Sequence, residues 1–180
     1  VMICVGRLAP EKNLQTVLEA HAAVAAVRPD AKLVFVGDGP MRAELQARCP
    51  QAILAGQRRG EDLAAHYASA DLFVFPSLTE TYGNVTAEAM ASALPVVAFD
   101  CAAAGQLIRC GRNGVLVSGD NGADFTHEAL RLALDAPRRA QLGAAARATA
   151  LEHGWADVVR RFEAHLTQAI DQPADGVGVA

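Results

Sequence analysis

The sequence that decides the fold is FVFPSLTETYGNVTAEAM, residues 73–90. An apolar run ends at Pro76, and a helix-forming segment begins at about Gly83. A helix that starts close behind a strand leaves its first amide groups unpaired, and such amides bind anions. The loop and the helix also carry two carboxylates, Glu80 and Glu88, eight positions apart. Because a carboxylate on either side of an anion site can bind hydroxyl groups beside a phosphate, the segment predicts a nucleotide-sugar site.

The start of this helix is expected to supply several amides to an anion. Gly83 or Asn84 is expected to cap the helix, which places Glu88 about one turn inside it. The amides available to the anion belong to Thr81, Tyr82, Gly83, Asn84 and Val85. The spacing alone leaves two simpler explanations open. Glu88 could lie on a solvated helix face, and Glu80 could be a favourable charge near the helix dipole.

Alternating strands and helices extend on both sides of this segment. Apolar runs predict six strands, at residues 1–5, 32–36, 51–55, 71–75, 95–99 and 114–117. Helical patterns lie between them, at residues 11–28, 40–48, 60–69, 83–93 and 103–110. Continuous apolar strands alternating with helices are typical of parallel sheets that are covered on both faces. The sequence therefore predicts an α/β fold with a doubly wound, Rossmann-like parallel sheet. Two or three closing helices are expected between residues 120 and 169.

Several polar loops directly follow strands, and the carboxyl ends of parallel strands form the ligand-binding edge of such sheets. The first of these loops holds Arg7 and Lys12. Pro10 suits the first turn of a helix, so Lys12 is expected near a helix start. A cation there opposes the helix dipole at a cost of about 0.3–1 kcal/mol, unless an anion binds beside it. We therefore predict phosphate binding by Arg7 and Lys12, with local neutralisation by Glu11 as the alternative.

The loop after the second strand contains Gly37 and Gly39, and glycines allow positive φ angles and close backbone approach. This loop is compatible with a plain turn. The glycine pattern of dinucleotide-binding domains does not follow the first strand, which argues against an NAD-type domain.

Composition indicates one globular domain, because 180 residues with 52% hydrophobic content suffice for a full core. The net charge of −4 argues against a nucleic-acid partner. The sequence has no signal peptide pattern and no apolar run of the roughly 20 residues that span a bilayer. The four cysteines are expected to be reduced, buried or half-buried thiols of a cytosolic protein. We expect a domain over residues 1–170 and a disordered tail over residues 171–180.

Five ordered motifs together resemble the C-terminal, donor-binding domain of GT-B glycosyltransferases of the retaining family 4. The first two are GRLAPEKN at residues 6–13 and VGDGP at residues 36–40. The Glu80–Glu88 pair is similar to the family's E-x7-E motif. EAMA at residues 88–91 with PVV at residues 95–97, and GRNGVLV at residues 111–117, complete the match. The resemblance covers residues 1–169, and the sequence from Glu80 to Thr86 resembles members that transfer mannose or related sugars.

The resemblance implies a role for each matched position. Arg7 and Lys12 would bind the donor diphosphate and stabilise the leaving group, and Glu80 would contact the sugar. Glu88 would accept hydrogen bonds from the ribose hydroxyls. Further donor-binding positions are Gly6, Gly37, Gly56, Gln57, Thr81, Tyr82, Gly83, Asn84 and Val85, with Gly56 and Gln57 beside the nucleobase.

The resemblance also implies what lies outside these residues. The donor would be a UDP- or GDP-sugar, with no cofactor and no metal, and the sequence lacks an Asp-x-Asp pair. The N-terminal domain that binds the acceptor, a lipid or glycan, is absent. We therefore expect weak donor binding, no transfer by this chain alone, and an apolar patch near the C-terminus where the missing domain packs. The full-length protein would be cytoplasmic, with peripheral association at the inner face of the membrane.

Three departures from the family pattern and two rival functions accompany the resemblance. Ala93 replaces a usual glycine, so an ordinary helix end is expected there instead of a tight turn. Residues 101–104 replace a glycine-rich turn, and Gln106 replaces a common glutamate. The rivals are another GT-B enzyme such as a sugar-nucleotide epimerase, which the Glu80–Glu88 pair disfavours, and a non-catalytic nucleotide-sugar module.

Overall fold

The computed structural model describes residues 1–80 and 82–171. Its centre is a six-stranded, wholly parallel sheet in the order β3-β2-β1-β4-β5-β6. The strands are β1 (Met2–Val5), β2 (Leu33–Val36), β3 (Ile53–Gly56), β4 (Leu72–Phe75), β5 (Val96–Phe99) and β6 (Val115–Val117). Each predicted strand is present within two residues of its predicted bounds, and the doubly wound α/β fold is confirmed.

Strand β1 lies in the middle of the sheet and is buried along its whole length. It pairs with β2 on one side and with β4 on the other. The chain first builds outward through β2 to β3, then returns to the middle and builds outward through β4 and β5 to β6. The carboxyl ends of all six strands therefore form one edge of the sheet, and the crossover direction reverses between β1 and β4.

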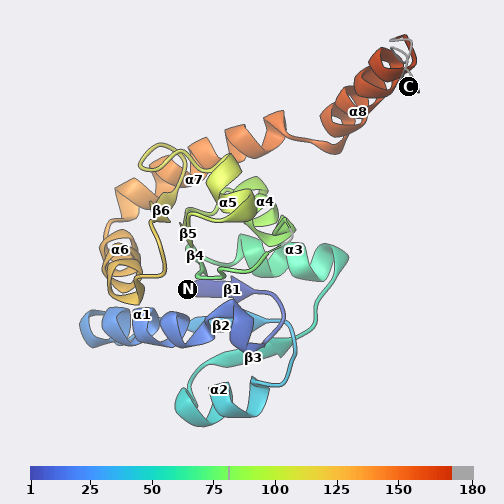
Figure 1. The fold of residues 1–180 in the computed structure, drawn as a ribbon. Helices are drawn as coiled ribbons and strands as arrows, with labels where there is room; N and C mark the ends of the chain where they lie inside the picture. Colours follow the sequence, from blue (N-terminus) through green and yellow to red (C-terminus); the bar gives the residue numbers. More distant parts are fainter. Residues whose placement is uncertain (81, 172–180) are drawn as a thin grey trace, which may run out of the picture. The chain divides into compact units, whose positions relative to one another are not determined.

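Five helices connect the strands: α1 (Leu14–Val27), α2 (Arg42–Arg48), α3 (Gly60–Ala68), α4 (Asn84–Ala91) and α5 (Ala102–Leu107). Right-handed crossovers place α1 and α2 on one face of the sheet and α3, α4 and α5 on the other (Figure 1). The prediction of one helix over residues 11–28 was wrong at its start. A short 3₁₀ turn, η1 (Pro10–Lys12), comes first. Asn13 then adopts a left-handed conformation (φ 53°) that separates it from α1.

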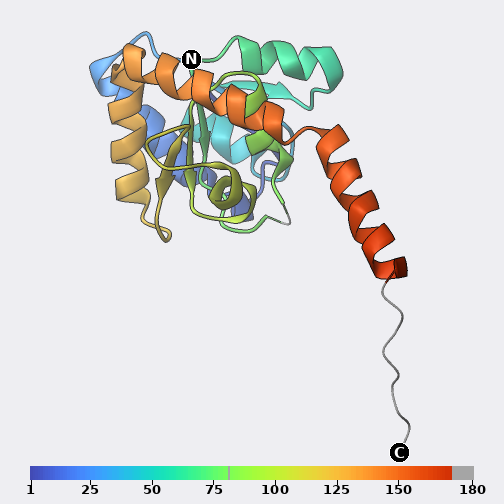
Figure 2. The ribbon, with the colours of Figure 1, turned by 90° about the horizontal axis from the view of Figure 1, so that it is seen from above.

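Three helices close the chain, as expected: α6 (Gly122–Leu134), α7 (Ala136–Glu152) and α8 (Trp155–Asp171). Helix α6 packs beside α1, and Figure 2 shows α7 (orange) crossing the region of α4. The crossing is close, because a Cβ atom at Gly143 of α7 would lie 2.1 Å from the carbonyl oxygen of Ala93. Only glycine fits at this contact between α7 and the end of α4.

The expectation of an ordinary helix end at Ala93 was wrong. Ala93 has a φ of 59°, so the tight left-handed turn is present without a glycine. The amide of Ala93 donates to the carbonyl of Met90 (3.0 Å), and the amide of Leu94 donates to that of Ala89 (3.0 Å). These two bonds define a Schellman cap, which glycine normally ends. Ala102 likewise has a φ of 46° in the segment where the family has glycines.

The cysteines match expectation except at the edge of the sheet. Cys4 and Cys49 are buried and Cys101 is half-buried, but Cys110 is exposed, which corrects the prediction for that thiol. Cys110 lies in the loop before β6, and its Sγ contacts the backbone nitrogen (3.4 Å) and oxygen (3.6 Å) of Leu116. β6 is an edge strand, so these groups have no neighbouring strand to pair with. The thiol is exposed because it covers this edge.

The chain divides into two compact units, residues 1–150 and residues 151–180. Within the second unit, α8 presents Val159, Phe162, Leu166 and Ile170 at helical spacing, with 48–80% of each residue exposed. The expected apolar patch is therefore present, and its packing on a missing domain stays a prediction.

Residues 172–180 of the expected disordered tail lie outside the described residues. Among the described helices, none is both long and apolar enough to cross a bilayer.

Ala93→Gly is expected to stabilise the chain by about 0.5–1 kcal/mol. A non-glycine residue pays a steric cost in the left-handed conformation, and glycine removes it. Urea unfolding followed by circular dichroism measures the change. Ala91→Gly in the last turn of α4 is the matched control and should destabilise by a similar amount, because Ala91 is helical. A loss of stability in Ala93→Gly would contradict the strained cap.

Candidate donor-binding site

The loops after β1 and β2 interlock through their backbones. The amide of Leu8 donates to the carbonyl of Asp38 (2.9 Å), and the amide of Met41 donates to that of Leu8 (2.9 Å). Gly37 has a φ of 139°, and a Cβ atom there would lie 1.8 Å from the carbonyl oxygen of Gly6. Glycine is therefore required at residue 37 by close backbone approach, and the two loops form one rigid rim at the carboxyl edge.

Lys12 and Glu80 meet across this edge from loops 68 positions apart in sequence. The Lys12 ammonium donates to Oε1 of Glu80 in an ion pair whose side chains are each 15% exposed. The buried Ser77 hydroxyl donates to the same oxygen (2.7 Å). A second tie joins the same loops, since the Thr79 hydroxyl donates to the carbonyl of Glu11 (3.3 Å). The structure thus brings together the predicted cation after β1 and the predicted carboxylate after β4.

Arg7 lies in the same loop as Lys12 but is much more exposed. Its side chain is 68% exposed, and its guanidinium lies 3.6 Å from the Glu11 carboxylate. An ion pair at this distance on the surface contributes little and leaves the guanidinium free to rearrange. Local neutralisation by Glu11 therefore applies to Arg7, whereas Lys12 pairs with Glu80.

Glu88 is exposed on the second turn of α4, but it is not simply solvated. Its Oε2 accepts a hydrogen bond from the hydroxyl of Tyr67 (2.9 Å), which comes from α3. Tyr67 is only 2% exposed. Burial raises the pKa of the Tyr67 hydroxyl, and the negative charge of Glu88 raises it further. Tyr67 therefore keeps its proton and acts as a donor to the carboxylate.

The start of α4 has the expected shape. Gly83 is the N-cap with a φ of 91°, and Asn84 and Val85 form the first turn. Tyr82 is exposed, and its carbonyl accepts from the amide of Ala103 (2.7 Å), which ties this loop to α5. Thr81, another predicted donor-binding residue, lies outside the described residues. The N-terminal end of α4 therefore lies next to the Glu80 side chain.

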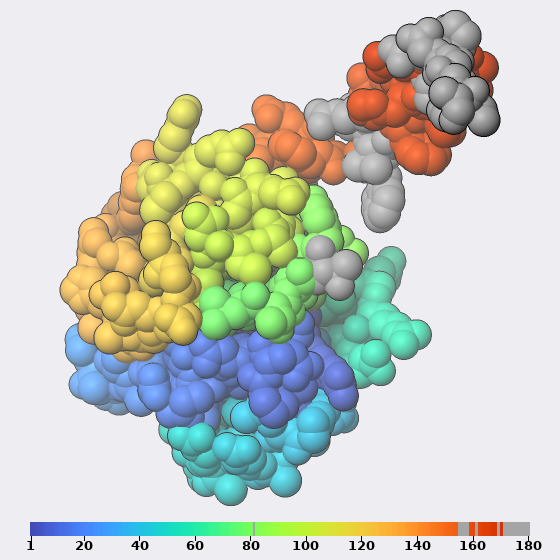
Figure 3. All heavy atoms as spheres, in the orientation of Figure 1, coloured from blue at the N-terminus to red at the C-terminus, as the bar shows by residue number. Residues whose placement is uncertain are grey.

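A cavity of about 500 Å³ continues the site toward β3. It is lined by Val5, Gly6, Arg7, Val36, Gly37, Asp38, Gln57 and Arg58. Gly56 has a φ of 75°, and the space a Cβ atom would occupy there is open. Figure 3 shows the beginning of the chain (blue) directly against the region of β4 and α4 (green). The predicted positions after β1, β2 and β3 thus share one hollow, which Arg7 lines from the same loop as Lys12.

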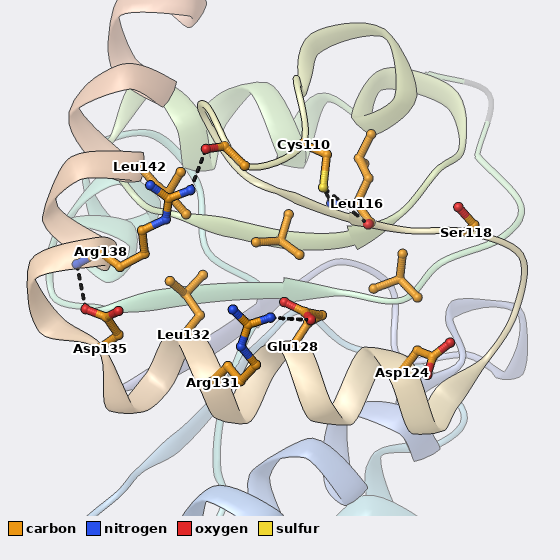
Figure 4. Close-up of a pocket in the computed structure, with 13 residues that line it drawn as sticks. Cys110, Leu116, Ser118, Asp124, Glu128, Arg131, Leu132, Asp135, Arg138 and Leu142 are labelled. Carbon is orange, nitrogen blue, oxygen red and sulfur yellow. Dashed lines mark hydrogen bonds and ion pairs between the residues drawn. The ribbon is translucent and has the colours of Figure 1, made fainter.

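A second hollow of about 540 Å³ lies at the other side of the sheet, beside β6 (Figure 4). None of the predicted site residues lines it. Its charged side chains are engaged locally: Arg131 pairs with Glu128 (2.9 Å), and the guanidinium of Arg138 donates to the carbonyl of Gly111. The hollow near Arg7 is the candidate donor site, because Gly6, Gly37 and Arg7 line it at the carboxyl ends of the strands.

Sequence reasoning missed four residues of the site. Ser77 was not among the predicted site residues, although its position three residues before Glu80 allows the hydrogen bond that forms. Asp38 and Arg58 line the cavity beside the predicted Gly37 and Gln57, and adjacency could have indicated both. Tyr67 gave no signal, because its partner Glu88 is 21 positions away and on another helix.

Comparison with known proteins identifies the family. The model of the family "Glycosyl transferases group 1" matches residues 1–135, so the chain belongs to this family. It is 42% identical over 161 residues to a GDP-mannose-dependent alpha-mannosyltransferase of Mycolicibacterium smegmatis, covering 89% of this chain and 41% of that protein. It is 45% identical over 147 residues to a protein of the same name from Mycobacterium tuberculosis, covering 77% and 37%.

The structural comparison agrees with the fold. The pneumococcal O-GlcNAc transferase GtfA, solved with UDP and GlcNAc, superimposes with a TM-score of 0.82 at 18% identity, covering 95% of this chain and 36% of that one. The chain therefore has the architecture of one part of a GT-B glycosyltransferase. It spans about two fifths of the length of the two mannosyltransferases that it resembles.

Glu80→Gln is expected to lower the free energy of unfolding by about 1–2 kcal/mol, because Lys12 then lies half-buried beside a neutral partner. Lys12→Met should lower it by a similar amount. The double variant should lose less than the sum of the two, which a double-mutant cycle in urea measures. The exposed pair Arg48–Glu44 is the matched control and should show no measurable coupling. If the losses in unfolding free energy of Glu80→Gln and Lys12→Met simply add in the double variant, the two side chains do not interact, and the partly buried ion pair is contradicted.

Proposed function

We propose that this chain is the donor-binding domain of a retaining glycosyltransferase that uses GDP-mannose and transfers mannose to a lipid or glycan acceptor. One observation carries the proposal: Lys12 pairs with Glu80 between the loops after β1 and β4, and Arg7, from the same loop as Lys12, lines a cavity with Gly6 and Gly37. Ligands of doubly wound sheets bind at this reversal of strand order. The two mannosyltransferases at 42% and 45% identity support guanine as the base and mannose as the sugar.

The two cations account for the chemistry that the transfer needs. When the sugar leaves GDP, negative charge develops on the diphosphate, and fixed positive charges stabilise it. Lys12 is held in place by Glu80, and Arg7 is exposed at the rim of the cavity. We propose that the diphosphate takes the place of Glu11 beside Arg7 and shares Lys12 with Glu80. Because these side chains supply the charge, the proposed reaction needs no metal ion and no cofactor.

The two carboxylates account for recognition of the hydroxyl groups. Glu80 lies next to Lys12, so a sugar attached to the bound diphosphate would be within reach of its carboxylate. Glu88 would accept hydrogen bonds from the ribose. The amides of Gly83, Asn84 and Val85 would bind phosphate or sugar oxygens at the start of α4. The base would occupy the cavity beside Gly56 and Gln57.

The acceptor would be bound outside these residues. Since the chain spans about two fifths of its relatives, we propose that it binds the donor and that transfer needs the remaining part of the enzyme. The proposed location of the full-length protein is the cytoplasm, at the inner face of the membrane where the acceptor is a lipid.

Calorimetric titration of the chain with GDP and with UDP tests the proposal. We expect GDP to bind more tightly than UDP. Arg7→Ala should weaken GDP binding about 10–100-fold, because hydrogen bonds to charged groups are strong. Arg28→Ala is the matched control: it removes the same charge from an exposed pair with Asp30, just beyond the C-terminal end of α1. Its affinity for GDP should equal that of the unmodified chain.

Three results would contradict parts of the proposal. Absence of binding by either nucleotide would refute the donor site in this chain. Tighter binding of UDP would refute the assignment of guanine. An equal effect of Arg7→Ala and Arg28→Ala would show that Arg7 acts only through net charge and not at a defined site.

A further inference from the structure

We propose that Tyr67 is a positioning residue for nucleotide recognition, and that its hydroxyl holds the Glu88 carboxylate in the orientation that binds the ribose. The inference rests on the proposed function, since it assumes that a nucleotide occupies the carboxyl edge of the sheet. It assigns a role in ligand binding to α3, a helix that contributes none of the predicted site residues.

Tyr67 is buried, whereas its partner Glu88 is exposed. Glu88 is exposed on α4, where a glutamate side chain normally samples several rotamers. Binding a ribose diol would require it to adopt one of them, at an entropic cost. The hydrogen bond from Tyr67 to Oε2 (2.9 Å) selects an orientation before any ligand arrives. Oε1 and the second lone pair of Oε2 remain as acceptors for hydroxyl groups.

Tyr67 itself is held by the hydrophobic core. It is 2% exposed, and its ring packs against Phe73 of β4, with centroids 5.9 Å apart. Phe73 in turn stacks on Phe75, with centroids 5.6 Å apart. Both phenylalanines are buried in the strand that ends at the site. Tyr67 is therefore held in one position by the core, and its hydrogen bond orients the Glu88 carboxylate at the surface.

The Tyr67 hydroxyl has an acceptor other than Glu88. Its hydroxyl also lies 3.4 Å from the carbonyl oxygen of Val85, which is on the same helix as Glu88. A buried hydroxyl whose only task was to be hydrogen-bonded could donate to that carbonyl alone. The shorter contact is instead to the exposed carboxylate, which points to a role for the carboxylate's orientation.

The experiment compares two ligands that differ only in the ribose hydroxyls, GDP and 2′,3′-dideoxy-GDP. Tyr67→Phe keeps the ring and removes the hydroxyl. We expect it to weaken GDP binding about three- to ten-fold, the effect of losing one hydrogen bond that orients a ligand-binding group, and to leave dideoxy-GDP binding unchanged. In Glu88→Gln the same substitution should have no further effect on GDP binding, because Tyr67 acts through the carboxylate.

Ser69→Ala is the matched control. It removes a hydroxyl from the C-terminal end of α3 that donates to Ala65 in the same helix, so GDP binding should not change. Equal weakening of GDP and dideoxy-GDP by Tyr67→Phe would show a general structural role and overturn the inference. Unchanged binding of both would overturn it as well, while the proposed function stands. If the unmodified chain binds no GDP, the proposed function itself fails, and the inference fails with it.

Discussion

The position of β1 between β2 and β4 is the constraint on which the rest of the structure depends. Because β1 pairs with both neighbours in parallel, the chain must leave its carboxyl end in one direction and return beside it from the other. The loops after β1 and β4 therefore face each other, and Lys12 meets Glu80 there. Close approach of Gly37 to the carbonyl of Gly6 fixes the neighbouring rim. The site is thus a consequence of strand order, and its charges lie where a doubly wound sheet binds ligands.

Charge balance explains how this edge remains stable without a ligand. Lys12 lies close to the start of α1, where a cation is unfavourable, and both Lys12 and Arg7 have a carboxylate partner. The pairs differ in strength because they differ in burial. Lys12 and Glu80 are largely shielded from solvent and share Ser77, whereas Arg7 and Glu11 form a long, exposed contact. A bound diphosphate would displace the weak pair and leave the strong one as a fixed element of the site.

Much of this could be predicted from the sequence, because its signals are local. Continuous apolar runs indicated all six strands, and the resemblance placed Arg7, Lys12, Glu80 and Glu88. Left-handed residues were harder to predict: Asn13 interrupts the expected first helix, and Ala93 keeps a glycine-type turn without a glycine. The long-range partner of Tyr67 was also missed, since its contact with Glu88 depends on how two helices from different parts of the chain meet in three dimensions. The exposure of Cys110 depends in the same way on β6 being the edge strand.

The central claim is that the donor binds at the carboxyl ends of β1 to β4. Backbone amide NMR of the isotope-labelled chain, titrated with GDP-mannose, tests it most directly. The account predicts that chemical-shift changes cluster in residues 6–13, 37–41, 56–59 and 77–88, and that the hollow beside β6 is unaffected. Changes centred on α6 and β6, with none around Lys12 and Glu80, would contradict it.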